Sequence, residues 1–232
     1  MQKRQKAANN SMTVRFDDLS QFDPLTENQD IAYRAWDDGD NLVLTGSAGT
    51  GKTFMALYLA LEEVLDPNTA CDQLVIIRSM VPTRDIGFLP GTVEEKKEAY
   101  TLPYKHICNE LFGDKSSFNK MVTSGLLIFE STSFIRGATF DNSVIVVDEM
   151  QNLNFHELDS VITRVGKNTK IIFSGDYRQS DFKYDDERNG IIRFLQIVEQ
   201  LKNFTVVNYG WEDIIRSDFV RDYIMTKEML GY

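Results

Sequence analysis

Six short runs of apolar residues form the most regular pattern along this chain. They are rich in Val, Ile and Leu, and they do not alternate between apolar and polar positions. Continuous apolar runs of this length are typical of strands that are buried on both faces, as in a parallel sheet. The runs are Leu42–Thr45, Leu74–Ile77, Leu126–Phe129, Val144–Val147, Lys170–Phe173 and Phe204–Val207.

Segments with helical periodicity lie between most of these runs. One of them has Asn154 as a predicted N-cap, with Glu157 three residues later, which is the pattern of a capping box. Because strands and helices alternate, the sequence predicts an α/β fold with a doubly wound, mostly parallel sheet and helices on both faces. The predicted helices are Asn28–Trp36, Thr53–Leu65, Phe155–Val165 and Ile191–Leu201.

Two parts of the chain do not fit the predicted core. Residues 1–24 are assigned to an N-terminal arm, and residues 1–12 of it are polar. Residues 25–232 are assigned to a single domain. A long segment of mixed character, at about residues 81–123, interrupts this domain, and we expect it to form an insert between two core strands.

Composition narrows the class of protein. The chain has 232 residues, of which 42% are hydrophobic and 26% charged, and its formal net charge is −10. These values indicate a folded globular protein and argue against a disordered or fibrous one. Because the chain is acidic, contact with a nucleic acid would need a local basic face.

The sequence shows no feature typical of membrane insertion, secretion or metal binding. No apolar run approaches the roughly 20 residues that a membrane-spanning helix needs, and the charged N-terminus lacks the apolar segment of a signal peptide. Cys71 and Cys108 form no disulfide framework, and neither they nor His106 and His156 have metal-ligand spacing. We therefore expect a cytoplasmic protein with reduced thiols and no membrane partner.

One motif carries a specific chemical meaning. The segment GSAGTGKT fits G-x-x-x-x-G-K-[ST] and lies between the first predicted strand and a predicted helix, which is the context that the motif requires. Such a loop turns backbone N–H groups around phosphate oxygens at a helix N-terminus, where anions are favoured. Lys52 would bridge the β- and γ-phosphates of ATP, and the Thr53 hydroxyl would ligate Mg²⁺. The predicted phosphate ligands are Gly46, Ser47, Ala48, Gly49, Thr50, Gly51, Lys52 and Thr53.

Two carboxylates follow the predicted strand Val144–Val147. Asp148 would hold Mg²⁺, directly or through a water, and Glu149 would orient and polarise the attacking water. Adjacent acids after a strand are often solvated turn residues, but their pairing with a phosphate loop favours the catalytic interpretation. Because hydrolysis needs an activated water, Glu149 favours a hydrolase over a small-molecule kinase.

Two glutamines are further candidates. Gln179 lies in the segment GDYRQ after a predicted strand, where its amide can reach the γ-phosphate. Gln29 precedes the first core strand and is a candidate for reading the adenine edge.

Taken together, these motifs resemble the PhoH-like family of P-loop ATPases, whose core is similar to one RecA-like motor domain of superfamily 1 helicases. The resemblance extends from about Leu25 to the C-terminus. Its further matches are GFLPGTVEEK from Gly87, FIRGATF from Phe134, DEMQN from Asp148, TRVGKNTK from Thr163 with SGD from Ser174, and DIIRS from Asp213.

The chain departs from the family pattern in three places. It has Arg78-Ser79-Met80-Val81 where the family usually has RP before the valine, and Tyr177 where a proline is commoner. Ser217 stands where the family usually has a histidine. None of these changes removes an ATP ligand.

The resemblance implies a homo-oligomeric ring, in the family a hexamer, that uses ATP and Mg²⁺ and acts on RNA or single-stranded DNA. One motor domain does not close an ATP site alone, so an arginine of a neighbouring subunit is expected to complete it. Arg216 is our first choice because it follows the core strands, and Arg78, Arg136 and Arg164 are alternatives. Compact relatives of this kind are familiar from phages, which suggests a phage origin and a location in the host cytoplasm.

Two questions stay open at this point. A nucleotide-gated binding or assembly protein with slow turnover is the alternative to a nucleic-acid-coupled ATPase. The insert mixes lysines with aromatic residues, which would either stack bases or form a solvated face. Its candidate contacts are Arg84, Lys96, Lys97, Tyr100, Tyr104 and Lys105.

Overall fold

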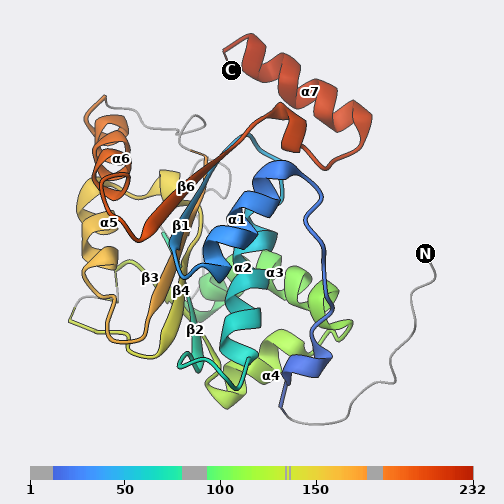
Figure 1. Ribbon diagram of the computed structural model, residues 1–232, viewed down its shortest axis with the longest axis vertical. Coiled ribbons are helices and arrows are strands. Elements are labelled where there is room, and N and C mark those ends of the chain that lie inside the picture. Colours follow the sequence, from blue (N-terminus) through green and yellow to red (C-terminus); the bar gives the residue numbers. More distant parts are fainter. Residues whose placement is uncertain (1–12, 80–92, 134, 136, 177–184, 232) are drawn as a thin grey trace.

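The computed structural model describes residues 13–79, 93–133, 135, 137–176 and 185–231. Its centre is a six-stranded sheet in the order β3-β2-β4-β5-β1-β6, in which all neighbouring strands are parallel (Figure 1). The strands are β1 (Asn41–Gly46), β2 (Gln73–Arg78), β3 (Leu127–Ser131), β4 (Ser143–Val147), β5 (Lys170–Ser174) and β6 (Phe204–Tyr209). The six predicted strands and the α/β fold with a parallel sheet are confirmed.

Helices cover both faces of this sheet (Figure 1). Leu42 and Leu44 of β1 join a core under the helices of one face, whereas Val43 joins a second core on the opposite face. This division explains why the strands are apolar at consecutive positions. The first face carries α1 (Glu27–Asp37), α2 (Lys52–Leu65), α3 (Val93–Phe112) and α4 (Ser117–Ser124), and the other carries α5 (Phe155–Ile162) and α6 (Asp185–Val198).

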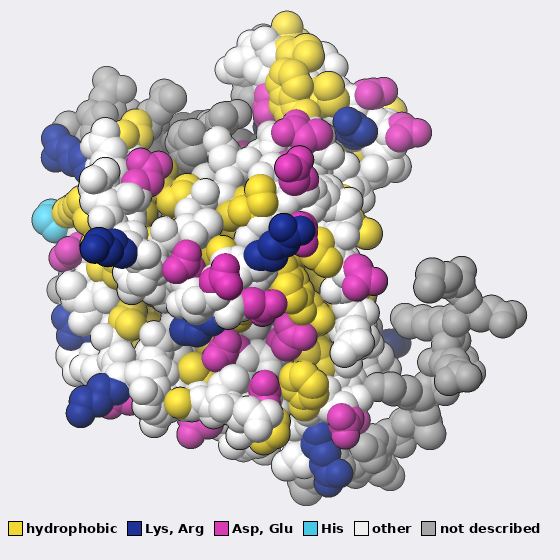
Figure 2. All heavy atoms as spheres, viewed as in Figure 1, with side chains coloured by type: hydrophobic (Ala, Val, Ile, Leu, Met, Phe, Trp, Pro, Cys, Tyr) yellow, Lys and Arg dark blue, Asp and Glu magenta, His cyan; other side chains and the backbone are white. Residues whose placement is uncertain are grey.

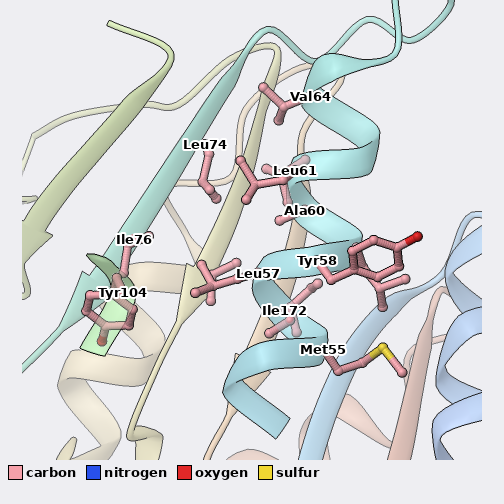
Figure 3. Close-up of a cluster of buried hydrophobic side chains, with 14 of the residues drawn as sticks. Met55, Leu57, Tyr58, Ala60, Leu61, Val64, Leu74, Ile76, Tyr104 and Ile172 are labelled. Carbon is pink, nitrogen blue, oxygen red and sulfur yellow. The ribbon is translucent and has the colours of Figure 1, made fainter. Parts of the chain in front are cut away.

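Helix α2 is anchored firmly over the sheet. Its residues Leu57 and Leu61 are fully buried and lie on the side that faces Leu74, Ile76 and Ile172 of the strands (Figure 3). Burying one such aliphatic side chain stabilises a fold by about 1.5–3 kcal/mol. This packing fixes the N-terminus of α2, which begins with the Lys52 of the GKT sequence.

Helices α1 and α2 match the predicted bounds to within one residue at each end, whereas two helices differ from them by three residues or more. Helix α5 ends at Ile162 instead of Val165, because Val165 forms a β-bridge with Phe140 and the next N–H donates to the Phe140 carbonyl at 2.8 Å. Helix α6 spans Asp185–Val198 instead of Ile191–Leu201.

The predicted N-terminal arm is described from Thr13 onward, and this part packs against the domain. Leu19 is only 7% exposed, and the N–H of the next residue donates to the Leu111 carbonyl at 2.8 Å. The Phe22 ring contacts Phe54 and Tyr58, with centroid distances of 5.1 and 5.8 Å. Residues 13–24 therefore lie across α2 and α3.

The segment expected to form an insert contributes to the helical layer. Helices α3 and α4 connect β2 to its neighbour β3, and Tyr104, Cys108 and Leu111 of α3 are fully buried. The connection thus serves as the crossover that parallel strands require. Both cysteines are free and buried, and burial raises the pKa of Cys71 to about 11 and that of Cys108 to about 12.

The C-terminal helix α7 (Asp218–Met229) is loosely packed. None of its residues is buried, and Phe219 and Tyr223 are 80% and 63% exposed. The helix lies beyond the end of β6 at the top of Figure 1, and Figure 2 shows apolar side chains exposed there. No helix in the described part of the chain has both the length and the apolar character that crossing a membrane demands.

Candidate functional site

Three neighbouring strands, β4, β5 and β1, end at the same edge of the sheet. The segments that follow them converge there: Asp148–Glu149 after β4, Gly175–Asp176 after β5, and the phosphate loop, Gly46–Thr53, after β1. A cleft of about 670 Å³ opens between these segments. The predicted loop and the predicted carboxylates therefore line one cavity.

The phosphate loop requires glycine where it leaves the sheet. Gly46 has φ +115°, and a Cβ atom there would lie 2.0 Å from the carbonyl oxygen of Tyr209 in β6. Gly51 caps α2 in the left-handed conformation, with φ +83°. The N-terminus of α2 is therefore directed at the cleft, and the helix dipole favours an anion there.

Lys52 lies folded into the loop. Its Nζ atom donates to the carbonyl oxygens of Gly46 and Ser47 at 2.8 and 2.6 Å, and to Thr50 Oγ1 at 3.3 Å. Burial lowers the pKa of this ammonium, although nearby carboxylates, Asp176 first among them, act in the opposite direction. The cation is thus held by loop oxygens, in a position from which it can transfer to phosphate oxygens.

Thr53 and Asp148 contact each other across the cleft. The Thr53 hydroxyl donates to Asp148 Oδ1 at 2.9 Å, and Asp148 is only 3% exposed. A hydroxyl and a carboxylate oxygen are the hard ligands that Mg²⁺ prefers. Among the described residues no group of three His, Cys, Asp or Glu side chains could hold a metal. The Thr53–Asp148 pair would suit a metal that takes its remaining ligands from phosphate and water.

Glu149 is held in an uncommon backbone conformation beside Asp148. Its φ is 54°, a left-handed value that costs a non-glycine residue on the order of 1–3 kcal/mol. Burial and the adjacent Asp148 raise the pKa of Glu149, while Arg78, Gln151 and Lys52 lower it. The strained turn directs a carboxylate into the cleft.

Gln151 links Glu149 to the end of β5, and it was not among the predicted site residues. Its Nε2 donates to Glu149 Oε2, and its Oε1 accepts from the Asp176 N–H at 3.0 Å. A Cβ atom on Gly175 would lie 2.2 Å from Gln151 Oε1, so the contact also depends on glycine at that position. Tyr104, whose hydroxyl donates to Asp148, was also missed as a site residue.

Of the two glutamines predicted to contact ATP, only Gln29 lies within the described residues. Gln29 lines the cleft, and its Nε2 donates to the Thr50 carbonyl at 3.1 Å while its Oε1 accepts from the Leu25 N–H at 2.8 Å. These contacts leave one amide hydrogen for a base, so its adenine role stays a prediction. Gln179 lies outside the described residues.

The candidate arginines are dispersed. Arg216 lines the cleft of its own chain, where a Cβ on Gly49 would lie 3.0 Å from its Cγ. Arg78 is the last residue of β2, and its guanidinium lies 5.6 Å from the Tyr100 ring centroid. Arg164 lies after α5, at the edge of the sheet where β5 begins, and donates to two backbone carbonyls there. Arg136 is outside the described residues.

Helix α7 reaches the phosphate loop through one carboxylate. Glu228 Oε2 accepts from Ser47 Oγ at 3.0 Å and from Trp211 Nε1 at 2.6 Å. A negative charge therefore lies beside a loop that is suited to anions, and it belongs to a helix with little other packing.

The proposed aromatic contacts for nucleic acid are wrong in part. Tyr100 is 5% exposed and Tyr104 is fully buried, so neither ring can stack on a base. Both tyrosines belong to α3, and they are buried because they lie on the face of this helix that packs against the sheet. Lys97 and Lys105 are partly exposed beside Glu130 and Glu98, at 4.0 and 3.4 Å. Arg84 and the side chain of Lys96 lie outside the described residues.

Comparison with known proteins identifies relatives of the whole domain. Residues 21–227 match the family model described as "PhoH-like protein". The protein PhoH2 of Bacillus subtilis (strain 168) is 36% identical over 165 residues, covering 69% of this chain and 37% of PhoH2. The PhoH-like protein of Mycobacterium leprae is 28% identical over 202 residues, covering 87% of this chain and 57% of the relative. The chain thus spans 37% and 57% of the length of these two curated relatives.

Solved structures confirm the fold. The large terminase of a thermophilic bacteriophage, solved in complex with ADP, aligns with a TM-score of 0.51 and 14% identity. The alignment covers 89% of this chain and 50% of the terminase. At this level of identity the likeness shows a shared architecture.

Proposed function

This chain belongs to the PhoH-like protein family, and from that membership and the geometry of the cleft we propose that it is an Mg²⁺-dependent ATPase, hydrolysing ATP to ADP and phosphate. The observation that carries the proposal is the contact between Thr53 and Asp148. It pairs the phosphate loop with a buried carboxylate, and Lys52 and Glu149 border the same cleft.

In this proposal ATP binds with its phosphates in the loop. The backbone N–H groups at the start of α2 donate to phosphate oxygens, and Lys52 exchanges the loop carbonyls for the β- and γ-phosphates. Thr53 and Asp148 would hold Mg²⁺, and a bound Mg²⁺ would supply positive charge to the phosphates. Gln29 is proposed to meet the adenine through its remaining amide hydrogen.

Glu149 is proposed to act on the attacking water. Its carboxylate accepts a hydrogen bond from the water and directs the oxygen at the γ-phosphate. Gln151 keeps that carboxylate in place, and the family position of Gln179 suits a contact with the γ-phosphate. The Glu149 carboxylate has to be ionised, so activity should fall as the pH falls through its raised pKa.

Coupling to RNA or single-stranded DNA in a homo-oligomeric ring, in the family a hexamer, is the finer part of the proposal. It rests on the family resemblance. Arg216 is exposed and lies against its own loop. This position supports a role on the nucleotide of the same chain, and its assignment to a neighbouring subunit stays a prediction.

The alternative function is a nucleotide-gated assembly protein in the cytoplasm with slow turnover. The observation that favours it is α7, which carries exposed apolar residues and contacts the phosphate loop through Glu228. Nucleotide at the loop would then alter a surface that is suited to another chain.

Phosphate release tests both functions. The wild-type chain and a Lys52→Ala variant are assayed with Mg²⁺-ATP, with and without single-stranded RNA or DNA, and the particle mass is measured in the same buffers. We expect release by the wild type, stimulation by one of the polymers, and loss of release in the variant. If neither RNA nor DNA changes the rate of phosphate release, the assembly function is favoured. If Lys52→Ala releases phosphate as fast as the wild type, an ATPase at this site is contradicted.

A further inference from the structure

Asp148 has a second partner, on a helix that none of the nucleotide motifs includes. The Tyr104 hydroxyl of α3 donates to Asp148 Oδ2 at 2.9 Å, while the Thr53 hydroxyl of α2 donates to Oδ1 at the same distance. Each oxygen of the carboxylate thus accepts one of these two hydrogen bonds, and the two donors come from different helices. This arrangement fixes the plane of the carboxylate and leaves Oδ1 on the side of the phosphate loop.

The contact between Tyr104 and Asp148 is shielded from water. Tyr104 is fully buried and Asp148 is 3% exposed, so solvent does not compete for the phenolic proton. The Tyr104 ring packs against Phe129 of β3, at a centroid distance of 5.7 Å, and it lies to the left of α2 in Figure 3. Arg78 interacts electrostatically with both Tyr104 and Asp148, which supplies a positive charge beside the carboxylate.

We propose that Tyr104 is a positioning residue for the magnesium site: its hydroxyl orients Asp148 so that Oδ1 is presented, with Thr53, to Mg²⁺. The inference rests on the proposed function and extends it to α3. Residues that orient a metal ligand typically change metal affinity by about 10–100-fold when they are removed. The same contact makes the position of α3 part of the nucleotide site.

Binding of a fluorescent ATP analogue, with and without Mg²⁺, tests this role without relying on turnover. Tyr104→Phe removes the hydroxyl and keeps the ring. We expect it to reduce the gain in affinity that Mg²⁺ provides by about tenfold, and to leave the affinity in EDTA unchanged. In an Asp148→Asn background, the same substitution should have no further effect, because the two residues act through one contact.

Tyr33→Phe is a matched control. The Tyr33 hydroxyl also donates to a carboxylate, Glu62 Oε2 at 2.7 Å, but that pair does not line the cleft. This variant should keep the full Mg²⁺-dependent gain. Thermal unfolding of Tyr104→Phe, measured beside Tyr33→Phe, shows whether the loss of gain accompanies a loss of the fold: a lost gain in a folded variant supports the inference, and a lost gain that appears only with unfolding contradicts it.

The outcomes separate the two proposals. A wild-type chain that binds no nucleotide would contradict the proposed function, and this inference with it. A wild type whose affinity rises with Mg²⁺, beside a Tyr104→Phe variant with the same rise, would overturn the inference alone. An equal loss of affinity with Mg²⁺ and in EDTA would also overturn it, because that pattern indicates a general structural role.

Discussion

The two halves of the cleft are built in different ways. The phosphate half is one continuous segment, in which Lys52 contacts the carbonyls of Gly46 and Ser47, six and five positions away. The carboxylate half is assembled from α3, β4 and β5: Tyr104 reaches Asp148 across 44 positions, and Gln151 reaches Asp176 across 25. The first half is encoded locally, whereas the second exists once the sheet has formed.

This difference assigns a separate task to each half. The phosphate half supplies N–H groups and a cation, which bind phosphates in any reaction. The carboxylate half supplies the groups that would hold a metal and orient a water, which decide whether ATP is hydrolysed. Variants in the first half should therefore lose nucleotide binding with and without Mg²⁺, whereas variants in the second should keep the binding that does not depend on Mg²⁺ and lose turnover.

Gly46→Ala should have the largest effect on the phosphate half. The new methyl group would lie 2.0 Å from the Tyr209 carbonyl oxygen, which belongs to the sheet backbone and cannot move away. We expect the free energy of unfolding to fall by more than about 3 kcal/mol, with loss of nucleotide binding. Denaturant unfolding and titration with a fluorescent nucleotide measure the two effects.

Gly39→Ala is the control for that experiment. Gly39 also has a positive φ, +93°, but no atom lies within 4 Å of a Cβ placed there. Its cost should be limited to backbone strain of about 1–2 kcal/mol, with binding retained. Equal losses in the two variants would mean that the close approach to β6 does not matter.

Gln151→Leu should have an intermediate effect, confined to the carboxylate half. Loss of its hydrogen bond removes one donor that favours the charged form of Glu149, so the pKa of Glu149 should rise. We expect hydrolysis to fall by about tenfold, and the acid limb of the pH–rate profile to move to higher pH. An acid limb that stays in place, or a matching loss of nucleotide affinity, would show that Gln151 does not act through Glu149.

Glu228→Gln should have the smallest effect. It tests whether nucleotide binding by the phosphate half depends on the phosphate loop alone or also on α7. The substitution removes a negative charge that lies beside Ser47. We expect nucleotide affinity to rise by about twofold at low salt, and by less at high salt because counterions screen the charge. Asp222→Asn, at an exposed position on the same helix, serves as the control and should show no change.

The same division explains which parts of the fold and of the site could be predicted from the sequence. Continuous apolar runs predicted all six strands, because strands of a parallel sheet are buried on both faces. The phosphate loop could be predicted because its spacing and its strand–helix context lie in one segment. Tyr104 could not be assigned to the site: a tyrosine among lysines has the same pattern whether it faces solvent or a buried carboxylate. Gln151 was visible within DEMQN, but its contact with Asp176 depends on the order of β4 and β5.

The central claim is that phosphate binding and hydrolysis depend on different halves of one cleft. Glu149→Gln tests it most directly, through ATP affinity and the single-turnover rate of hydrolysis measured on the same protein. We predict affinity within about threefold of the wild type and a rate reduced by at least about 100-fold, since the variant keeps the loop and loses the base. An unchanged rate, or a loss of affinity as large as the loss of rate, would contradict this account.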